Sequence, residues 1–466
     1  MLLKHSALYL LARGFPGLVN FLAIAVYTRF LAPEEYGRYA LVVAGVGFFN
    51  VVFFQWLRLA LLRFLPAHLE NPSLLLSTLL ACFFVLATLT GGIGLLLACL
   101  WPDPVWRGLI LLAVPLLWVE GWFELNLELA RSRLQPLRYG LMSCVKATSA
   151  LVLGILSLLW GFGVYGPLLG LLAGTLLALP LGIAEWKNTF LYPLKPLVKE
   201  LLRYGLPLTF TFAMAFIVSS SDRFMIAYFL GEDLAGVYSA AYDLSFTTIN
   251  LISWIIGLTT TPLAIRAFEE GGMQKAENQI LQNIRLLTVI LVPASIGLAA
   301  IARDVSQILL GTQFHQGKAE LIIAIISLSA ALHAFRNHHF DLAFQLGLST
   351  NMQFWIMVTA GITNLVLNLV FIPRLGTLGA AWATFVAYTV ALILSVAMGK
   401  RILSIPFDFV ILSKASVGSA LVLLLLLNLE DFTGFYGLFV KVSLGIIIYL
   451  AFWFVTLGFD IRRFLQ

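Results

Sequence analysis

Long apolar stretches separated by short polar connections make up almost the whole chain. A helix that crosses the hydrocarbon core of a bilayer needs about 20 apolar residues, and on that criterion the pattern predicts about fourteen spans. We expect them near residues 6–31, 37–62, 73–100, 106–129, 139–160, 165–185, 202–230, 236–266, 284–302, 320–346, 352–372, 377–399, 407–428 and 436–458. The pattern therefore predicts an all-α, polytopic membrane protein.

Composition agrees with this fold class, because 61% of the residues are hydrophobic and 11% are charged. A soluble enzyme cannot bury that much apolar surface in its own core. Cys82, Cys99 and Cys144 lie within apolar runs, and their spacing indicates neither a disulfide framework nor a metal site. The basic residues are spread between the spans, so nucleic acid is not an expected partner.

The distribution of lysine and arginine predicts the orientation of the chain. About 18 basic residues fall on one side of the predicted spans and about eight on the other, and the richer side is normally cytoplasmic. Both termini are therefore predicted to be cytoplasmic. The first apolar run, from Ser6 to Leu31, is longer than the core of a signal peptide, and we interpret it as the first membrane helix.

The start of the second half of the chain resembles the start of the first half. Gly14-Phe15-Pro16 is followed by residues 31–40, and Gly205-Leu206-Pro207 is followed by residues 230–239. Each pair predicts a helix that opens with Gly-x-Pro, then a leucine, an acidic pair and Gly-x-Tyr at the start of the next helix. Such a repeat indicates two parallel lobes of about six helices each, which usually frame a central cavity.

The repeat divides the chain into three parts. Residues 1–190 form the predicted N-lobe, residues 191–400 the C-lobe, and residues 401–466 two appended helices.

Three blocks of sequence carry a family resemblance. They are Thr28 to Tyr39 with Arg58 and Arg63-Phe64-Leu65, then Asp222 to Ile226 with 230–231 and 236–242, and finally 364–368 with 372–373 and 376–384. In order and separation they resemble the polysaccharide transporter (Wzx-type flippase) branch of the multidrug/oligosaccharidyl-lipid/polysaccharide exporter superfamily.

This resemblance implies a function. A member moves an undecaprenyl-diphosphate-linked oligosaccharide from the cytoplasmic to the periplasmic leaflet of a bacterial inner membrane by alternating access, for cell-surface polysaccharide such as lipopolysaccharide or exopolysaccharide. The expected partners are that lipid-linked sugar, membrane lipids and polysaccharide polymerase machinery. No cofactor is expected, although coupling to H⁺ or Na⁺ is. The appended helices are expected to border a groove for the polyprenyl tail.

Three cations lie inside predicted spans, where a charge is costly and usually faces a cavity or a partner. Arg13, Lys146 and Arg336 are therefore candidates, together with Arg58, for binding a diphosphate, because charge-assisted and bidentate hydrogen bonds suit its oxygens. Arg336 is expected to face water about midway through the membrane. The alternative is that these side chains snorkel to the interface.

A polar stripe accompanies Arg336. His333, Asn337 and Phe340 share its helical face at spacings of three and four residues. His333 and Asn337 are candidates for lining a sugar site, and so are three residues elsewhere, Asn20, Asn250 and Trp254. Metal binding by His333, His338 and His339 is disfavoured, because adjacent histidines point apart on a helix.

Acidic residues form a second candidate set. Glu120, Glu124 and Glu128 share one helical face, and the first two either neutralise Arg13 or Lys146 or carry a coupling proton.

Near the predicted outer surface, Asp222, Arg223 and Asp243 are gate candidates. Either Asp222 and Arg223 form an inter-helix lock at the periplasmic gate, or they form a simple packing ion pair.

Rival functions remain. A drug or small-molecule antiporter of the same superfamily would use acidic cavity residues, whereas more cations than acids reach inward here. An enzyme of glycan polymerisation would need a large outer loop, and the longest outer connection, 303–319, is too short.

Overall fold

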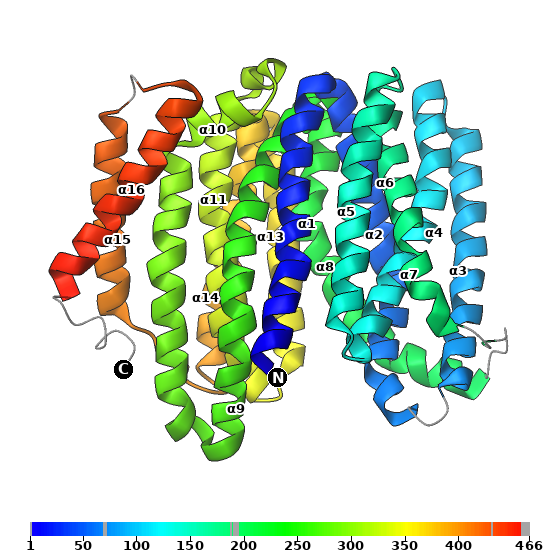
Figure 1. Cartoon of the computed structure of the whole chain (residues 1–466), viewed down its shortest axis with the longest axis horizontal. Helices are drawn as coiled ribbons and strands as arrows, with labels where there is room; N and C mark the ends of the chain where they lie inside the picture. The colour runs from blue at the N-terminus through cyan, green and yellow to red at the C-terminus, as the bar shows by residue number, and fades with distance from the viewer. Residues whose placement is uncertain (1, 69–71, 187–188, 190–194, 430–431, 458–466) are drawn as a thin grey trace. The chain divides into compact units, whose positions relative to one another are not determined.

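The computed structural model describes residues 2–68, 72–186, 189, 195–429 and 432–457, and within these ranges the regular structure is entirely helical (Figure 1). The chain divides into two compact units, unit 1 (Met1–Ser220) and unit 2 (Ser221–Gln466). The boundary between them falls within helix α8 (Lys195–Leu230).

Twelve helices in the described ranges are long and apolar enough to cross a membrane. One of them, α9 (Glu232–Ala300), has 69 residues, and its backbone leaves the helical conformation at Gly271 and Gly272. At 1.5 Å per residue an unbroken α9 would be about 100 Å long, three times the thickness of the hydrocarbon core. It is therefore two spans joined by a turn, as Figure 1 shows.

With these two arms counted separately, and with the 29-residue α1 (Leu2–Phe30) added, the twelve become fourteen. The predicted all-α, polytopic fold class is confirmed.

The remaining helices of unit 1 are α2 (Pro33–Phe64), α3 (Ser73–Leu100), α4 (Pro104–Ser132), α5 (Pro136–Leu159), α6 (Tyr165–Ala178) and α7 (Pro180–Ile183). Proline opens four of these helices, at a position where its missing N–H costs no intrahelical hydrogen bond. Asp103 caps α4 by accepting a hydrogen bond from the Val105 amide at 2.9 Å. The core of the unit lies where α2, α3 and α4 meet, around Leu57, Leu79 and Leu109.

Glycines hold α5 and α6 in close contact. A Cβ atom added to Gly170 would lie 2.4 Å from the backbone nitrogen of Gly154, and one added to Gly174 would lie 2.4 Å from that of Ala150. Small residues allow helix backbones in a membrane to approach this closely, so that dispersion forces hold them together. The seam matters for the site, because it fixes where Lys146 of α5 and Thr175 of α6 lie.

Unit 2 contains the rest of α8, both arms of α9, and α10 (Ala302–Leu309), α11 (Ala319–Phe335), α12 (Leu342–Leu346), α13 (Thr350–Leu375), α14 (Thr377–Gly399), α15 (Phe409–Leu427) and α16 (Gly434–Leu457). Between α11 and α12 the chain forms a π-helical turn, Arg336–Phe340. Within the same unit, α15 packs against α9, and the Tyr449 hydroxyl of α16 donates to the Val289 carbonyl of α9 at 3.0 Å.

One detail of the predicted repeat needs correction. The Gly-x-Pro motifs at residues 14–16 and 205–207 do not open helices, because α1 begins at Leu2 and α8 at Lys195. Proline is tolerated inside membrane helices, where neighbouring groups satisfy the carbonyl it leaves free. The other shared marks hold, since both α2 and α9 begin with an acidic pair. The three-part division of the chain and the central cavity stay predictions.

Candidate functional site

A cluster of four charged side chains lies inside the membrane spans of unit 1. We call Arg58, Glu120, Glu124 and Lys146 the unit 1 charge cluster. The Lys146 ammonium lies 2.6 Å from Glu120 Oε2, and the Thr175 hydroxyl lies 3.0 Å from Glu120 Oε1. Lys146 is about ten residues beyond the start of α5, so it lies about 15 Å along that helix. The pair is therefore deep within the bilayer, not at its surface.

The second pair of this cluster joins α2 to α4. Arg58 donates to Glu124 at 3.3 Å and also contacts Gln55. The Glu124 side chain is 38% exposed, and a carboxylate inside a span is stable there only if its exposed part meets water. The Nε of Arg58 is buried without a hydrogen-bond partner in the described part of the chain, so the guanidinium has one donor to spare.

The predicted roles of Glu120 and Glu124 included neutralising a cation, and the structure places Glu120 against Lys146 and Glu124 against Arg58. Of the other unit 1 candidates, Asn20 is exposed on α1, and the side chain of Arg13 lies outside the part of the chain whose side chains the structure describes. Binding and coupling by these residues stay predictions.

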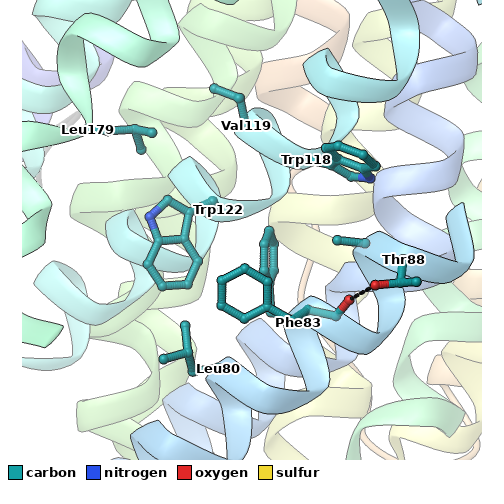
Figure 2. Close-up of a pocket in the computed structure, with 9 residues that line it drawn as sticks. Leu80, Phe83, Thr88, Trp118, Val119, Trp122 and Leu179 are labelled. Carbon is teal, nitrogen blue, oxygen red and sulfur yellow. Dashed lines mark hydrogen bonds between the residues drawn. The ribbon is translucent and has the colours of Figure 1, made fainter. Parts of the chain in front are cut away.

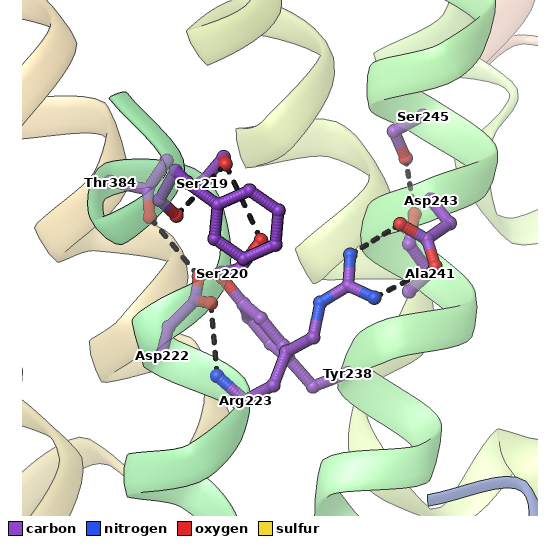
Figure 3. Close-up of polar contacts among 10 residues, drawn as sticks. Ser219, Ser220, Asp222, Arg223, Tyr238, Ala241, Asp243, Ser245 and Thr384 are labelled. Carbon is purple, nitrogen blue, oxygen red and sulfur yellow. Dashed lines mark hydrogen bonds and ion pairs between the residues drawn. The ribbon is translucent and has the colours of Figure 1, made fainter. Parts of the chain in front are cut away.

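A second polar centre lies in unit 2, around Asp222 of α8 (Figure 3). This carboxylate is fully buried. It accepts hydrogen bonds from the Tyr238 hydroxyl of α9, from the Arg223 amide at 2.9 Å and from the Thr384 hydroxyl of α14 at 3.5 Å. A charge in a dry interior is stable only when several donors surround it in this way.

Arg223 turns away from Asp222 and meets another acid. Its guanidinium binds Asp243 of α9 through two hydrogen bonds, one of 3.0 Å (Figure 3). It also lies over the Tyr242 ring. The predicted pairing of Asp222 with Arg223 is therefore replaced by Arg223–Asp243, and the gate role of these three residues stays a prediction. Neighbouring residues on a helix point in directions about 100° apart, so the two side chains meet different residues of α9, Tyr238 and Asp243. The inter-helix ion pair is Arg223–Asp243.

Oxygen atoms of α13 extend the centre around Asp222. Asn364 accepts hydrogen bonds from Ser221 at 3.3 Å and from Asn368 at 3.0 Å, and its own amide donates to Thr384 at 3.4 Å. The Asn368 carbonyl oxygen is buried without a partner among the described residues. We call Ser221, Asp222, Asn364, Asn368 and Thr384 the Asp222 cluster. Carboxylate, amide and hydroxyl oxygens are the ligands that hard cations prefer.

Arg336 does not face water in this structure, which corrects the sequence prediction. It is 5% exposed, its Nε lies 3.6 Å from Asp341, and it contacts Met357 of α13. Ser395 of α14 donates to the same carboxylate at 2.6 Å. The cause is the π turn, in which the Asp341 amide bonds to the Arg336 carbonyl and so places the acid beside its own arginine.

The same turn breaks the predicted polar stripe. His333 is packed between Phe246 and Tyr388, with ring centroids 5.7 and 5.0 Å away, whereas Asn337 is exposed. His338 packs against Gly257, and His339 is buried beside Phe340 and Phe407. The three histidines therefore have three different environments. Asn250 and Trp254, predicted to line a sugar site, are partly buried in α9.

Comparison with known proteins identifies the family of this chain. Residues 26–319 match the family described as polysaccharide biosynthesis protein, and this match covers more than half of the chain. The chain belongs to the polysaccharide biosynthesis protein family.

Individual relatives of this polysaccharide biosynthesis family are distant in sequence. The chain is 23% identical over 283 residues to a probable low-salt glycan biosynthesis flippase of Haloferax volcanii. That match covers 60% of this chain and 59% of the relative, so the chain spans about three fifths of its length.

Solved structures show the likeness in fold. The inward closed conformation of the lipid II flippase MurJ matches 97% of this chain and 98% of its own, with a TM-score of 0.80 and 14% identity. An inward-facing multidrug resistance MATE family transporter matches 84% of this chain and 97% of its own, with a TM-score of 0.66 and 17% identity. At these identities the comparison establishes the fold alone.

Unit 1 of this polysaccharide biosynthesis family member also contains apolar pockets. One of about 420 Å³ lies between α3 and α4, where Phe83, Trp118 and Trp122 line it (Figure 2). Another of about 530 Å³ lies between α2, α3 and α8 and includes Trp56 and Cys82. Pockets of this size and apolarity suit hydrocarbon.

Proposed function

We propose that the chain is a flippase that moves undecaprenyl-diphosphate-linked oligosaccharide from the cytoplasmic to the periplasmic leaflet of a bacterial inner membrane. Movement is by alternating access, and no bond of the substrate is made or broken. Membership in the polysaccharide biosynthesis family, the flippase named among its relatives and the MurJ-like fold support this proposal. The observation that carries it is the pair of intramembrane cations, Arg58 and Lys146.

The position of these cations suits the task. Arg58 lies about six residues before the end of α2, and Lys146 about ten residues after the start of α5, so a head group entering from that side meets both within about 10–15 Å. Arg58 can bind a phosphate bidentately, and Lys146 adds a second positive charge. The half-exposed Glu124 places water at the same depth.

The Asp222 cluster is the proposed site of the coupling ion. Side-chain oxygens of five residues from α8, α13 and α14 suit Na⁺, and Asp222 itself can instead take a proton. In this proposal the termini and the basic connections lie on the cytoplasmic side. The transported lipid-linked sugar is then used by a polymerase that builds cell-surface polysaccharide.

The test is growth rescue of a bacterial strain that lacks its own flippase, with flipping measured in proteoliposomes that contain a fluorescent undecaprenyl-diphosphate sugar. The wild-type protein should rescue growth and flip the lipid, and Arg58→Gln should do neither, although it inserts at normal levels. Normal flipping by Arg58→Gln together with Lys146→Gln would contradict the proposal.

A drug antiporter is the second candidate, since the fold also resembles a multidrug resistance transporter. Drug resistance of the same strain without rescue of its glycan defect would favour that function. Coupling is tested in the same vesicles, because Asp222→Asn should abolish the response to an imposed Na⁺ gradient.

A further inference from the structure

The unit 1 charge cluster is electrically neutral as it stands. Arg58 and Lys146 supply two positive charges, and Glu120 and Glu124 supply two negative charges. Glu120 and Glu124 lie one turn apart on the same face of α4, so one helix holds both cations. Each cation is thus already paired before any substrate arrives.

Binding of an anionic substrate would therefore add negative charge to a cluster that is already neutral. A diphosphate brings at least two negative charges, and if both carboxylates stayed ionised the loaded cluster would have an excess of negative charge. An uncompensated charge inside the membrane is strongly disfavoured. Either the carboxylates leave, or they become neutral. Both are fixed on α4, which also carries the core residues Leu109 and Leu125, so leaving would disrupt the unit.

We infer that Glu120 and Glu124 take up protons when a diphosphate binds, and so release Lys146 and Arg58 to the anion. The inference rests on the proposed function and adds its proton partner. The protons come from water that reaches the half-exposed Glu124. After the exchange two cations face the diphosphate, and two neutral carboxylic acids remain on α4.

Thr175 is already arranged to accept the protonated form of Glu120. Its single hydroxyl proton lies within reach of two acceptors, the Leu171 carbonyl at 2.7 Å and Glu120 at 3.0 Å. A hydroxyl has one proton to donate but can also accept. When Thr175 donates to Leu171, its oxygen can accept the new O–H of Glu120. The buried carboxylic acid then keeps a hydrogen bond without Lys146.

Arg58 is likewise prepared for the exchange. Its unpartnered Nε is a donor that Glu124 and Gln55 leave unused. A phosphate that replaces Glu124 gains this extra donor, which a carboxylate in the observed position does not use.

Other charged groups near the cluster are already engaged. Glu128, one turn further along α4, lies 3.6 Å from Arg131 and also attracts Arg58, and Glu185 lies between Arg133 and Arg138. From α1, which packs on α5, the Tyr27 hydroxyl donates to the Ala150 carbonyl at 3.4 Å, and the Arg13 side chain lies outside the described part. Thr175 is the contact from α6. Glu120 and Glu124 are thus the carboxylates in direct contact with Arg58 and Lys146.

The experiment is calorimetric titration of the purified full-length protein in detergent with farnesyl diphosphate, a soluble isoprenoid diphosphate. It is run at about pH 8.5, where a phosphate with a pKa near 6 is already ionised and contributes no proton of its own. Repeating the titration in buffers with different ionisation enthalpies gives the number of protons taken up per ligand bound.

Wild type should take up nearly two protons, Glu120→Gln and Glu124→Gln about one each, and the double variant almost none. Two linked protons also mean that affinity should fall by up to about 100-fold per pH unit in wild type and stay flat in the double variant. Glu270→Gln is the control, because it removes a carboxylate of unit 2 that pairs with Arg266, and it should behave like wild type.

The outcomes separate the two proposals. Binding of farnesyl diphosphate without proton uptake overturns the exchange and leaves the proposed function in place. Failure of wild type to bind any isoprenoid diphosphate overturns the proposed function, and the exchange with it. Unfolding temperatures of the glutamine variants, which keep the shape of glutamate, distinguish lost binding from lost folding.

Discussion

The two polar centres of the molecule hold their charges in different ways. In the unit 1 charge cluster the side chains of Lys146 and Glu124 are 19% and 38% exposed, and each ion pair has one principal contact. In unit 2 the acid Asp222 is fully buried and accepts three hydrogen bonds, and Arg223 is 7% exposed and binds Asp243 through two hydrogen bonds, although the Asp243 side chain is itself 33% exposed. The first arrangement can exchange its partners for an arriving ion, whereas the second resists change.

The exposure of an ion pair and its number of hydrogen bonds determine how much its loss destabilises the fold. Exposed ion pairs contribute little to stability, because water screens them. Buried pairs contribute little when they form but cost a great deal when one partner is removed, since the other charge is left in a dry interior. The single contact of Arg58 with Glu124 therefore suits substrate exchange, and the two hydrogen bonds of Arg223 with Asp243 suit holding α8 against α9.

The largest expected effect tests this contrast directly. Arg223→Ala should lower the free energy of unfolding by about 3 kcal/mol, because Asp243, whose side chain is 33% exposed, loses two charge-assisted hydrogen bonds. Arg58→Ala should lower it by no more than about 1 kcal/mol, because Glu124 is half-exposed. Chemical unfolding of both variants in detergent measures the difference. The double variant Arg223→Met/Asp243→Leu is the control and should recover most of the lost stability.

The next effect concerns Arg336. Like Arg58, it was predicted from the sequence to bind a diphosphate, but like Arg223 it is buried. Arg336→Ala should lower the free energy of unfolding by about 2–3 kcal/mol, since Ser395 is then the one side-chain donor to the Asp341 carboxylate among the described residues. Arg336→Lys should recover part of that loss. If Arg336→Ala abolished flipping with no change in stability, the side chain would have to face substrate, as the sequence analysis predicted.

A smaller effect comes from the seam between α5 and α6. In Gly170→Ala the new Cβ would lie 2.4 Å from the Gly154 backbone, so the helices must separate, at a cost of about 1–3 kcal/mol. Gly92→Ala in α3 is the matched control, because nothing lies within 4 Å of its new Cβ. Equal unfolding temperatures for the two variants would show that close packing of α5 on α6 does not hold Thr175 near Glu120.

The smallest effect is expected at an ion pair outside the spans. Burial raises the pKa of Asp408, but hydrogen bonds from the Ile411 amide and Arg285 outweigh it and hold the pKa below its ordinary value. The stability that Asp408 contributes is therefore present above its unfolded pKa of about 3.9 and is lost as pH falls through the lower folded value. Unfolding temperatures measured down to about pH 3 should fall less steeply in Asp408→Asn than in wild type.

Sequence alone predicts the fold well, because the thickness of the hydrocarbon core sets the length of each span. Span length also predicts how deep Lys146 and Glu120 lie in the membrane. The two residues can pair because they lie at similar depths in neighbouring helices. It fails at Arg336, because a spacing of three and four residues assumes a regular α-helix and carries no sign of a π turn.

Long-range contacts are the other limit of prediction from the sequence. Asp222 and Arg223 are adjacent in the chain, but Tyr238, Asp243 and Thr384 decide their roles. Asn364 and Asn368 stood in a family-like block without an assigned role. Their spacing of four residues puts both amides on one face of α13. Two amides on one face of an apolar span are the sequence signal that could have identified them as site residues.

The turn at Gly271 and Gly272 has a practical consequence. The arm of α9 from Glu232 to Glu270 is about 58 Å long, longer than a bilayer with its head groups at about 45 Å. The tip of this hairpin, which carries Arg266, Glu270 and Lys275, therefore stands in water. It offers an attachment point for an epitope tag or a fluorophore outside the hydrocarbon core. A label at Lys275 that reacts only from the cytoplasm would fix the direction of every other helix in the chain.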